Sequence, residues 1–205
     1  MSAKSSEERL FGGASLASRS SERLCTPIVF LLDGLLEHQT GLAPKEITSD
    51  TAGYSDLMFG LFFLLGYQFS PRISDAGEAR FWRIDRAADY GLLDDLSRRN
   101  TIKTEIVRGN WEDILRVADS LKLGTVKASD VVRALHAGTR QSELAKAIAE
   151  IGRIAKSLFL LSYVDNESYR RRVLVQLNRH EARHNVAREI FHGDRGQVRK
   201  RYREG

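Results

Sequence analysis

The stretch Leu57–Leu65 reads Leu-Met-Phe-Gly-Leu-Phe-Phe-Leu-Leu and carries no charged residue. A helix that is apolar on nearly all sides is buried in the interior of its domain. Directly before it, Glu46–Ser49 is short and tolerant of β structure, the segment after Asp50 favours a turn, and Ser55 is a good helix N-cap. The sequence therefore predicts a strand ending at Asp50, a turn and a helix, and it places this βα unit in the core.

Apolar periodicity predicts the remaining elements. Two further strands are expected at 67–73 and 80–84. Helices are expected at 28–37, 111–122, 128–136, 141–163, 168–179 and from 181 or 182 to 191. Residues 1–24 show no sustained periodicity and are expected to form a disordered leader unrelated to the rest of the chain. The predicted fold class is α/β and mostly helical.

Positive charge is concentrated at one end of the chain. Tyr169–Gly205 carries 11 Lys/Arg against 4 Asp/Glu, a local charge of +7, whereas the whole chain carries +5. The other 168 residues therefore sum to −2. Such a cluster is an electrostatic footprint for a phosphate backbone, although acidic lipid or RNA would also be attracted.

Cysteine usage and apolar run length indicate the compartment. Cys25 is the single cysteine, which excludes an internal disulfide framework and a Cys-rich zinc site. The apolar runs Pro27–Leu36 and Leu57–Gly66 are each about ten residues long, against roughly 20 needed to span a bilayer. We therefore expect a cytoplasmic protein with no membrane contact.

Two carboxylates are candidates for chemistry. Asp50 would lie at the carboxyl end of a buried strand, where α/β architectures place their active sites, but an Asp there more often organises the turn that follows. Glu181 lies among arginines at helical spacing, where a surface ion pair worth about 0.2–1 kcal/mol is the ordinary outcome. Alternatively, both residues converge on one or two Mg²⁺ ions, which prefer oxygen ligands and can promote phosphodiester cleavage.

The arginines around Glu181 would then hold a DNA backbone without reading its bases. Lys156 could reach a phosphate or belong to a solvated helix face. The candidate DNA-binding residues are Arg170, Arg171, Arg172, Arg179, Arg183 and Lys156.

A competing motif overlaps Glu181. His180-Glu181-Ala182-Arg183-His184 matches the H-E-x-x-H pattern of zinc metalloproteases. Against a zinc site, Arg183 places a permanent cation between the two histidines, and the flanking residues are basic. A zinc protease therefore ranks third, behind a metal-dependent DNA enzyme and a non-catalytic nucleic-acid-binding helical module.

Several long segments together resemble the carboxyl-terminal catalytic region of the Tn-three family transposases. Among them are Thr-Ser-Asp-Thr-Ala-Gly-Tyr-Ser-Asp at 48–56, Phe-Gly-Leu-Phe-Phe-Leu-Leu-Gly-Tyr-Gln-Phe-Ser-Pro-Arg at 59–72, Glu-Ile-Gly-Arg-Ile-Ala-Lys at 150–156 and Gln-Leu-Asn-Arg-His-Glu-Ala-Arg-His at 176–184. Their common order, from about Pro27 to the end, makes the resemblance specific.

The resemblance implies a partial ribonuclease H-like core at 25–205, with a helical insertion at about 86–165. By motif, Asp50 resembles the second Asp of the family's Asp, Asp, Glu metal triad, and Glu181 resembles the Glu. The implied cofactor is Mg²⁺ or Mn²⁺. The implied partners are transposon-end and target DNA, with a homo-oligomer or association with intact transposase. The implied activity is metal-dependent DNA strand cleavage and transfer at transposon ends.

One part of the family pattern has no match. The family's first triad Asp lies in an Asp-Gly-x-x-Phe type segment upstream of the region that matches Leu31, and no such segment occurs in this sequence. Asp33 belongs to a different family segment inside a predicted helix. The chain therefore looks like a transposase fragment and is expected to be inactive, or nearly so, on its own.

Overall fold

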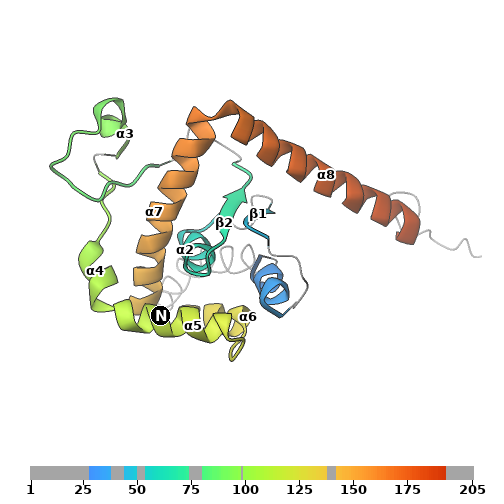
Figure 1. The fold of residues 1–205 in the computed structure, drawn as a ribbon, viewed down its shortest axis with the longest axis horizontal. Coiled ribbons are helices and arrows are strands. Elements are labelled where there is room, and N and C mark those ends of the chain that lie inside the picture. Colours follow the sequence, from blue (N-terminus) through green and yellow to red (C-terminus); the bar gives the residue numbers. More distant parts are fainter. Residues whose placement is uncertain are drawn as a thin grey trace, which may run out of the picture.

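The computed structural model describes residues 28–37, 44–49, 54–73, 80–97, 99–137 and 142–192, apart from the side chains of His180 and His192. A helix at 28–37 comes first. The elements that follow are β1 (Glu46–Ser49), α2 (Asp56–Leu64), β2 (Gln68–Pro71), η2 (Gly91–Leu93), α3 (Asp94–Ser97), α4 (Thr104–Gly109), α5 (Trp111–Lys122), α6 (Ala128–His136), α7 (Glu143–Asp165) and α8 (Glu167–His192). The described part is mostly helical with one small sheet, as predicted (Figure 1). The predicted leader at 1–24 and Asp50 lie outside the described residues.

The predicted βα unit is present in the core. β1 pairs with β2 in parallel, with Ile47 opposite Phe69. α2 begins after Ser55, whose Oγ accepts a hydrogen bond from the Met58 backbone N–H at 3.3 Å. This side-chain cap satisfies one of the N–H groups that the first helical turn leaves unpaired. The strand at 46–49, the helix after Ser55 and a strand within 67–73 are therefore confirmed.

Helices cover both faces of this sheet. Phe69 stacks on Phe62 of α2 with their ring centroids 4.5 Å apart, and α2 packs along α7. Successive strand residues point to opposite faces, so Ser70 faces the other way, and its Oγ lies 2.6 Å from the Tyr169 hydroxyl of α8. The sheet is thus a middle layer between α2 with α7 and the start of α8.

The helix at 28–37 is joined to α6 by a capping contact. Asp33 is 8% exposed, and its Oδ1 accepts a hydrogen bond from the Ser129 backbone N–H at 3.1 Å. Ser129 lies in the first turn of α6, whose own N-cap residue, Lys127, makes no side-chain cap bond. Asp33 therefore supplies from another helix the cap that α6 lacks locally. This structural role agrees with the expectation that Asp33 lies inside a helix.

The prediction of a strand at 80–84 is wrong. Among residues 80–84, Arg83 alone forms a β-bridge, to Thr101. The Trp82 backbone N–H donates to the Ser157 Oγ of α7 at 2.9 Å. Within the described residues 80–84, only the Arg83 N–H and C=O bond to the neighbouring segment, through the Asn100 carbonyl and the Ile102 N–H, so the pairing is a single bridge and not a ladder.

The prediction of separate helices at 168–179 and 181–191 is also wrong. α8 is one continuous helix from Glu167 to His192. No Gly or Pro interrupts this range, and most of its residues are compatible with a helix interior. Within the described residues, no helix is both long enough and apolar enough to cross a membrane.

Candidate nucleic-acid interface and metal centre

The first half of α8 is anchored on the polar face of the sheet. The Tyr169 hydroxyl accepts a hydrogen bond from Gln68 Nε2 at 3.0 Å and lies 2.6 Å from Ser70 Oγ. Val173, one turn further along, is 1% exposed. Burial raises the pKa of the Tyr169 hydroxyl, so this residue stays neutral. The helix therefore leaves the domain in a fixed direction (Figure 1).

The three consecutive arginines of α8 have three different environments. Arg170 Nη1 donates to the Tyr163 carbonyl at 3.1 Å and so helps to cap the end of α7. Arg171 is exposed and pairs with Glu167 at 2.7 Å. Arg172 pairs with Glu46 of β1 at 3.4 Å. Each of these arginines already has a protein partner.

Further along α8, three charged side chains are exposed and have no partner in the described part of the chain. Arg179, Glu181 and Arg183 make no hydrogen bond or ion pair with any other described residue. The ordinary outcome for Glu181, a surface ion pair with a neighbouring arginine, is therefore not seen in the described part. All three charged groups are available to a ligand.

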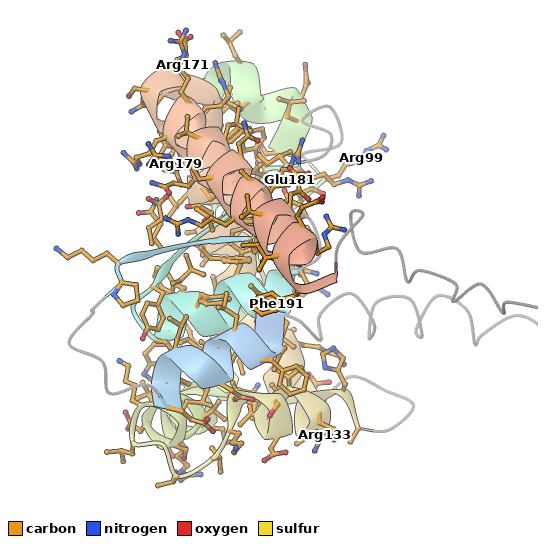
Figure 2. The ribbon with its side chains drawn as sticks, turned by 90° about the vertical axis from the view of Figure 1, so that its right-hand side faces the viewer. Arg99, Arg133, Arg171, Arg179, Glu181 and Phe191 are labelled. Carbon is orange, nitrogen blue, oxygen red and sulfur yellow. The ribbon has the colours of Figure 1, made fainter. Side chains whose placement is uncertain are left out.

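Helical geometry places Glu181 and the free arginines on different faces. Residues four and seven apart share a face, so Glu181 continues the face of the half-buried Leu174 and Leu177. Arg179 and Arg183 are four apart and share another face. Figure 2 shows Arg179 and Glu181 on opposite sides of α8. The Glu181 carboxylate is exposed and lies on the same side of α8 as Leu174 and Leu177. Arg179 and Arg183 continue the row of Arg172 and Gln176, which line a pocket with Glu46 and Thr48 of β1.

The predicted partner of Glu181 cannot be placed beside it. β1 ends at Ser49, and Asp50 lies outside the described residues. Among the residues that are described, no three His, Cys, Asp or Glu side chains form a group that could hold a metal ion. A shared metal site of Asp50 and Glu181 stays a prediction.

Lys156 belongs to a charged cluster between α7 and α2. Its Nζ lies 3.0 Å from Asp56 Oδ1 and 4.0 Å from the ring centroid of Tyr54. Arg153, one turn earlier on α7, pairs with the other oxygen of Asp56 at 3.0 Å. Lys156 is only 15% exposed, so this lysine has an internal structural partner. Its contact with DNA phosphate stays a prediction.

The cluster was not predicted from the sequence, although its elements were. Burial, reinforced by the charge of Asp56, raises the pKa of Tyr54 to about 12. Tyr54 and Asp56 begin the segment that follows Asp50, whereas Arg153 and Lys156 come from a helix about 100 residues later. The spacing of two cations three residues apart on α7 was the available signal, but only the tertiary fold identifies their partner.

The H-E-x-x-H motif lies within the continuous helix α8. His184 is exposed, and the His180 side chain is outside the described part. Because only one of the two proposed zinc ligands is described, the zinc protease stays a prediction.

Comparison with known proteins identifies the chain's relatives. Residues 27–205 match the family described as Tn3 transposase DDE domain. The chain is 58% identical over 177 residues to the transposase for transposon gamma-delta of Escherichia coli strain K12. It is 44% identical over 177 residues to the transposase for transposon Tn4556 of Streptomyces fradiae, and 44% identical over 173 residues to the transposase for transposon Tn1546 of Enterococcus faecium.

These matches cover 84 to 86% of the chain but only 17 to 20% of the relatives. The chain thus spans about a fifth of the length of the curated relatives it matches. No solved structure matches it. Since the family match extends over residues 27–205, the chain belongs to the Tn3 transposase DDE domain family.

Proposed function

We propose that this chain is part of a transposase catalytic domain that cleaves and transfers DNA strands at transposon ends. In this role Asp50 and Glu181 are two of the metal-binding carboxylates. The observation that carries the proposal is the position of Glu181. It is exposed and unpaired among the described residues, on the helix whose first turns pack over the sheet, while β1 leads directly into Asp50.

The arrangement of strands and helices supports a ribonuclease H-like fold. β1, α2 and β2 form a parallel βαβ unit, which requires a crossover helix and covering layers on both faces. α8 begins over β2 at Tyr169, and Arg172 then pairs with Glu46 of β1. The helix therefore crosses the sheet and carries Glu181 beyond β1.

The donor chemistry of Glu181 fits a hard divalent cation. Its carboxylate has no ion-pair partner among the described residues and is a preferred ligand type for Mg²⁺ or Mn²⁺. Asp50 and Glu181 would hold the ion. When bound, it would activate a hydroxyl or water nucleophile and stabilise the departing oxygen of a phosphodiester.

The free arginines of α8 support DNA as the partner. Arg179 and Arg183 can each contact a backbone phosphate without breaking a bond to a described residue. Arg171 and Arg172 are exposed, and an exposed ion pair is worth only about 0–1 kcal/mol, so both can exchange their carboxylates for phosphates. Lys156 and Arg170 are held more firmly, so we expect weaker contributions from them.

A domain-exchange experiment tests the proposal. The region matching 27–205 in the gamma-delta transposase is replaced by this sequence, and transposition of a marked element is measured in cells. We expect the chimera to be active, and Glu181→Gln or Asp50→Asn to abolish that activity. Glu189→Gln, an exposed glutamate on the same helix, is the matched control. Equal effects of the Glu181 and Glu189 substitutions would contradict the metal-binding role.

A non-catalytic nucleic-acid-binding module is the alternative, favoured by the exposed Arg179 and Arg183, which have no partner among the described residues. It predicts DNA binding that falls steeply with salt and is unchanged by a chelator. It also predicts that Glu181→Gln leaves the activity of the chimera intact. Association with a second copy or with intact transposase, and a place in the cytoplasm, remain part of the proposal.

A further inference from the structure

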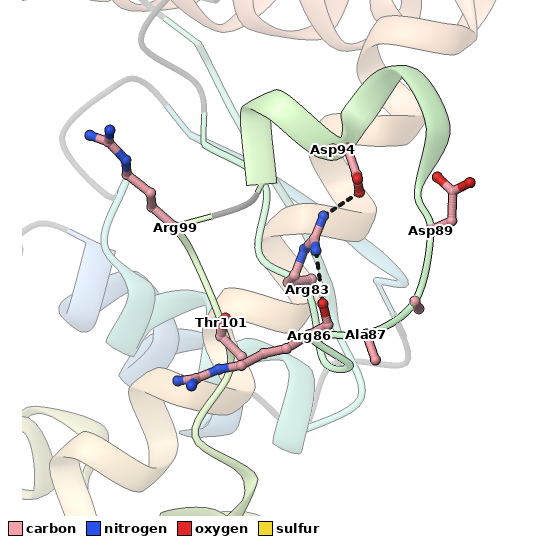
Figure 3. A pocket seen from close by; sticks show the side chains of 8 residues that line it. Arg83, Arg86, Ala87, Asp89, Asp94, Arg99 and Thr101 are labelled. Atoms are coloured by element: carbon pink, nitrogen blue, oxygen red, sulfur yellow. Dashed lines mark hydrogen bonds and ion pairs between the residues drawn. The ribbon is translucent and has the colours of Figure 1, made fainter.

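We propose that a polar pocket beside α3 binds a phosphate group of the DNA backbone, at a second contact separate from α8. The pocket has a volume of about 450 Å³, and Arg83, Arg86, Asp89, Asp94, Arg99 and Thr101 are among its lining residues (Figure 3). In Figure 1, α3 and α8 lie on opposite sides of the end of α7. The inference rests on the proposed function only in taking DNA as the ligand.

Arg83 forms a fixed floor for the pocket. It is 5% exposed and forms an ion pair with Asp94. Its Nε and Nη2 atoms lie 3.3 and 3.1 Å from Ser97 Oγ, and its Nη1 donates to the Arg86 carbonyl at 3.3 Å. These contacts use the Arg83 guanidinium internally, so it shapes the pocket without being free to bind a ligand.

The carboxylates of the pocket are also engaged. Asp94 is neutralised by Arg83, and Asp89 Oδ1 accepts a hydrogen bond from the Gly91 backbone N–H at 2.8 Å. Three arginines and two aspartates line the pocket, which leaves a net charge of +1. The pocket is therefore mildly positive, and its negative groups already have partners.

Two arginines remain for a ligand. Arg86 and Arg99 are exposed, and neither guanidinium bonds to another described residue. Figure 3 shows both side chains extending to one side of the pocket, with Asp89 on the other side. The ligand side of the pocket therefore presents two cations without an opposing carboxylate.

The backbone under both arginines is held in place. The Arg86 carbonyl accepts the hydrogen bond from Arg83, and the Asn100 N–H, next to Arg99, donates to the Ser97 carbonyl at 2.8 Å. A guanidinium on a fixed backbone can donate two parallel hydrogen bonds to a phosphate. Such contacts position a duplex and carry no base information.

The test measures DNA affinity against salt for the 205-residue chain with a short fluorescent duplex. The variant Arg86→Gln/Arg99→Gln removes the proposed contacts. The control, Arg108→Gln/Arg133→Gln, removes two arginines that are 78% and 75% exposed and pair with Glu105 and Asp130 on their own helices. Each lost phosphate contact lowers the slope of log K against log salt by about 0.9. We expect a decrease of about 1 to 2 for the pocket variant and none for the control.

A second arm titrates inorganic phosphate and follows the Arg86 and Arg99 Nε–H signals by NMR, which tests the pocket even if the chain binds no duplex. Phosphate shifts together with the reduced salt slope support the proposal. If phosphate shifts the arginine signals but the pocket variant keeps the wild-type salt slope, or no duplex binds, the assignment to DNA is overturned and the pocket is assigned to free phosphate. No phosphate shift and an unchanged slope overturn the site itself. Loss of duplex binding on changing Arg179 and Arg183 alone tests the α8 interface separately.

Discussion

Gly152 of α7 lies so close to Asp56 of α2 that a β-carbon on Gly152 would come within 1.6 Å of the Asp56 carbonyl oxygen. Gly60 makes the reciprocal approach, since its β-carbon would lie 2.2 Å from the Ile148 carbonyl oxygen. Both obstacles are backbone atoms of the opposite helix, which cannot rotate away. The two glycines therefore permit the close contact between α2 and α7 on which the core is built.

We predict that Gly152→Ala destabilises the chain by about 1–3 kcal/mol, because α2 and α7 must separate and lose packing. Chemical denaturation followed by circular dichroism measures the free energy of unfolding. Gly34→Ala is the control, because a β-carbon there meets nothing within 4 Å and a glycine in a helix costs about 0.5–1 kcal/mol relative to alanine. Equal stability of the two variants would show that α2 and α7 are not in this contact.

The sequence predicted those parts of the fold that depend on local pattern. The apolar stretch Leu57–Leu65 and the cap at Ser55 correctly predicted α2, because burial and capping leave a direct trace in composition. The contact of Gly152 with Asp56 leaves no such trace, since it joins segments 96 residues apart. Residues 80–84 were predicted to form a strand but make a single bridge at Arg83, because their pairing with residues 100–102 depends on the tertiary fold.

The candidate site was predictable in part for the same reason. The arginine cluster is visible in composition, and the exposed positions of Arg179 and Arg183 agree with a ligand-facing helix. The periodicity of α8 did not reveal that it is continuous, nor that Glu181 shares a face with Leu174 and Leu177. The engagement of Lys156 with Asp56 required the pairing of α2 with α7, which no local pattern encodes.

The raised pKa of Tyr54 predicts a loss of stability at high pH. Its folded-state pKa of about 12 lies above the ordinary tyrosine value of 10.0. Below pH 10 the hydroxyl is protonated in both states, and its contribution to stability is fully present. Between pH 10 and 12 the unfolded state releases the proton more readily, so that contribution is lost as pH rises.

The measurement compares wild type with Tyr54→Phe over this pH range by denaturant unfolding. We expect the free energy of unfolding of wild type, relative to that of Tyr54→Phe, to decrease as pH rises above 10. Other groups that titrate there, including Tyr169, are common to both proteins and cancel. A pH-independent difference would show that Tyr54 is not buried beside Asp56.

The cap that Asp33 provides for α6 predicts a specific stability loss. Asp33→Ala leaves the Ser129 N–H without its acceptor, and we expect a cost of about 0.5–2 kcal/mol. Asp130→Ala is the control, because Asp130 lies on the same helix but forms only an exposed ion pair with Arg133. Hydrogen exchange locates the effect, with faster exchange expected in the first turn of α6 for Asp33→Ala. Equal exchange in both variants would rule out the cap.

The free arginines of α8 predict a charge effect on DNA binding that is independent of metal. Arg179→Gln/Arg183→Gln removes two unpaired cations, so the salt slope of duplex binding should fall by about 2, and affinity should fall alike for every DNA sequence. Arg171→Gln is the comparison. Because Arg171 already pairs with Glu167, we expect this substitution to lower the salt slope by less. Fluorescence anisotropy with and without a chelator makes the measurement. Because phosphate contact needs only the guanidiniums, the chelator should change neither the affinity nor the salt slope. If the double substitution leaves the salt slope unchanged, the DNA binds to another surface.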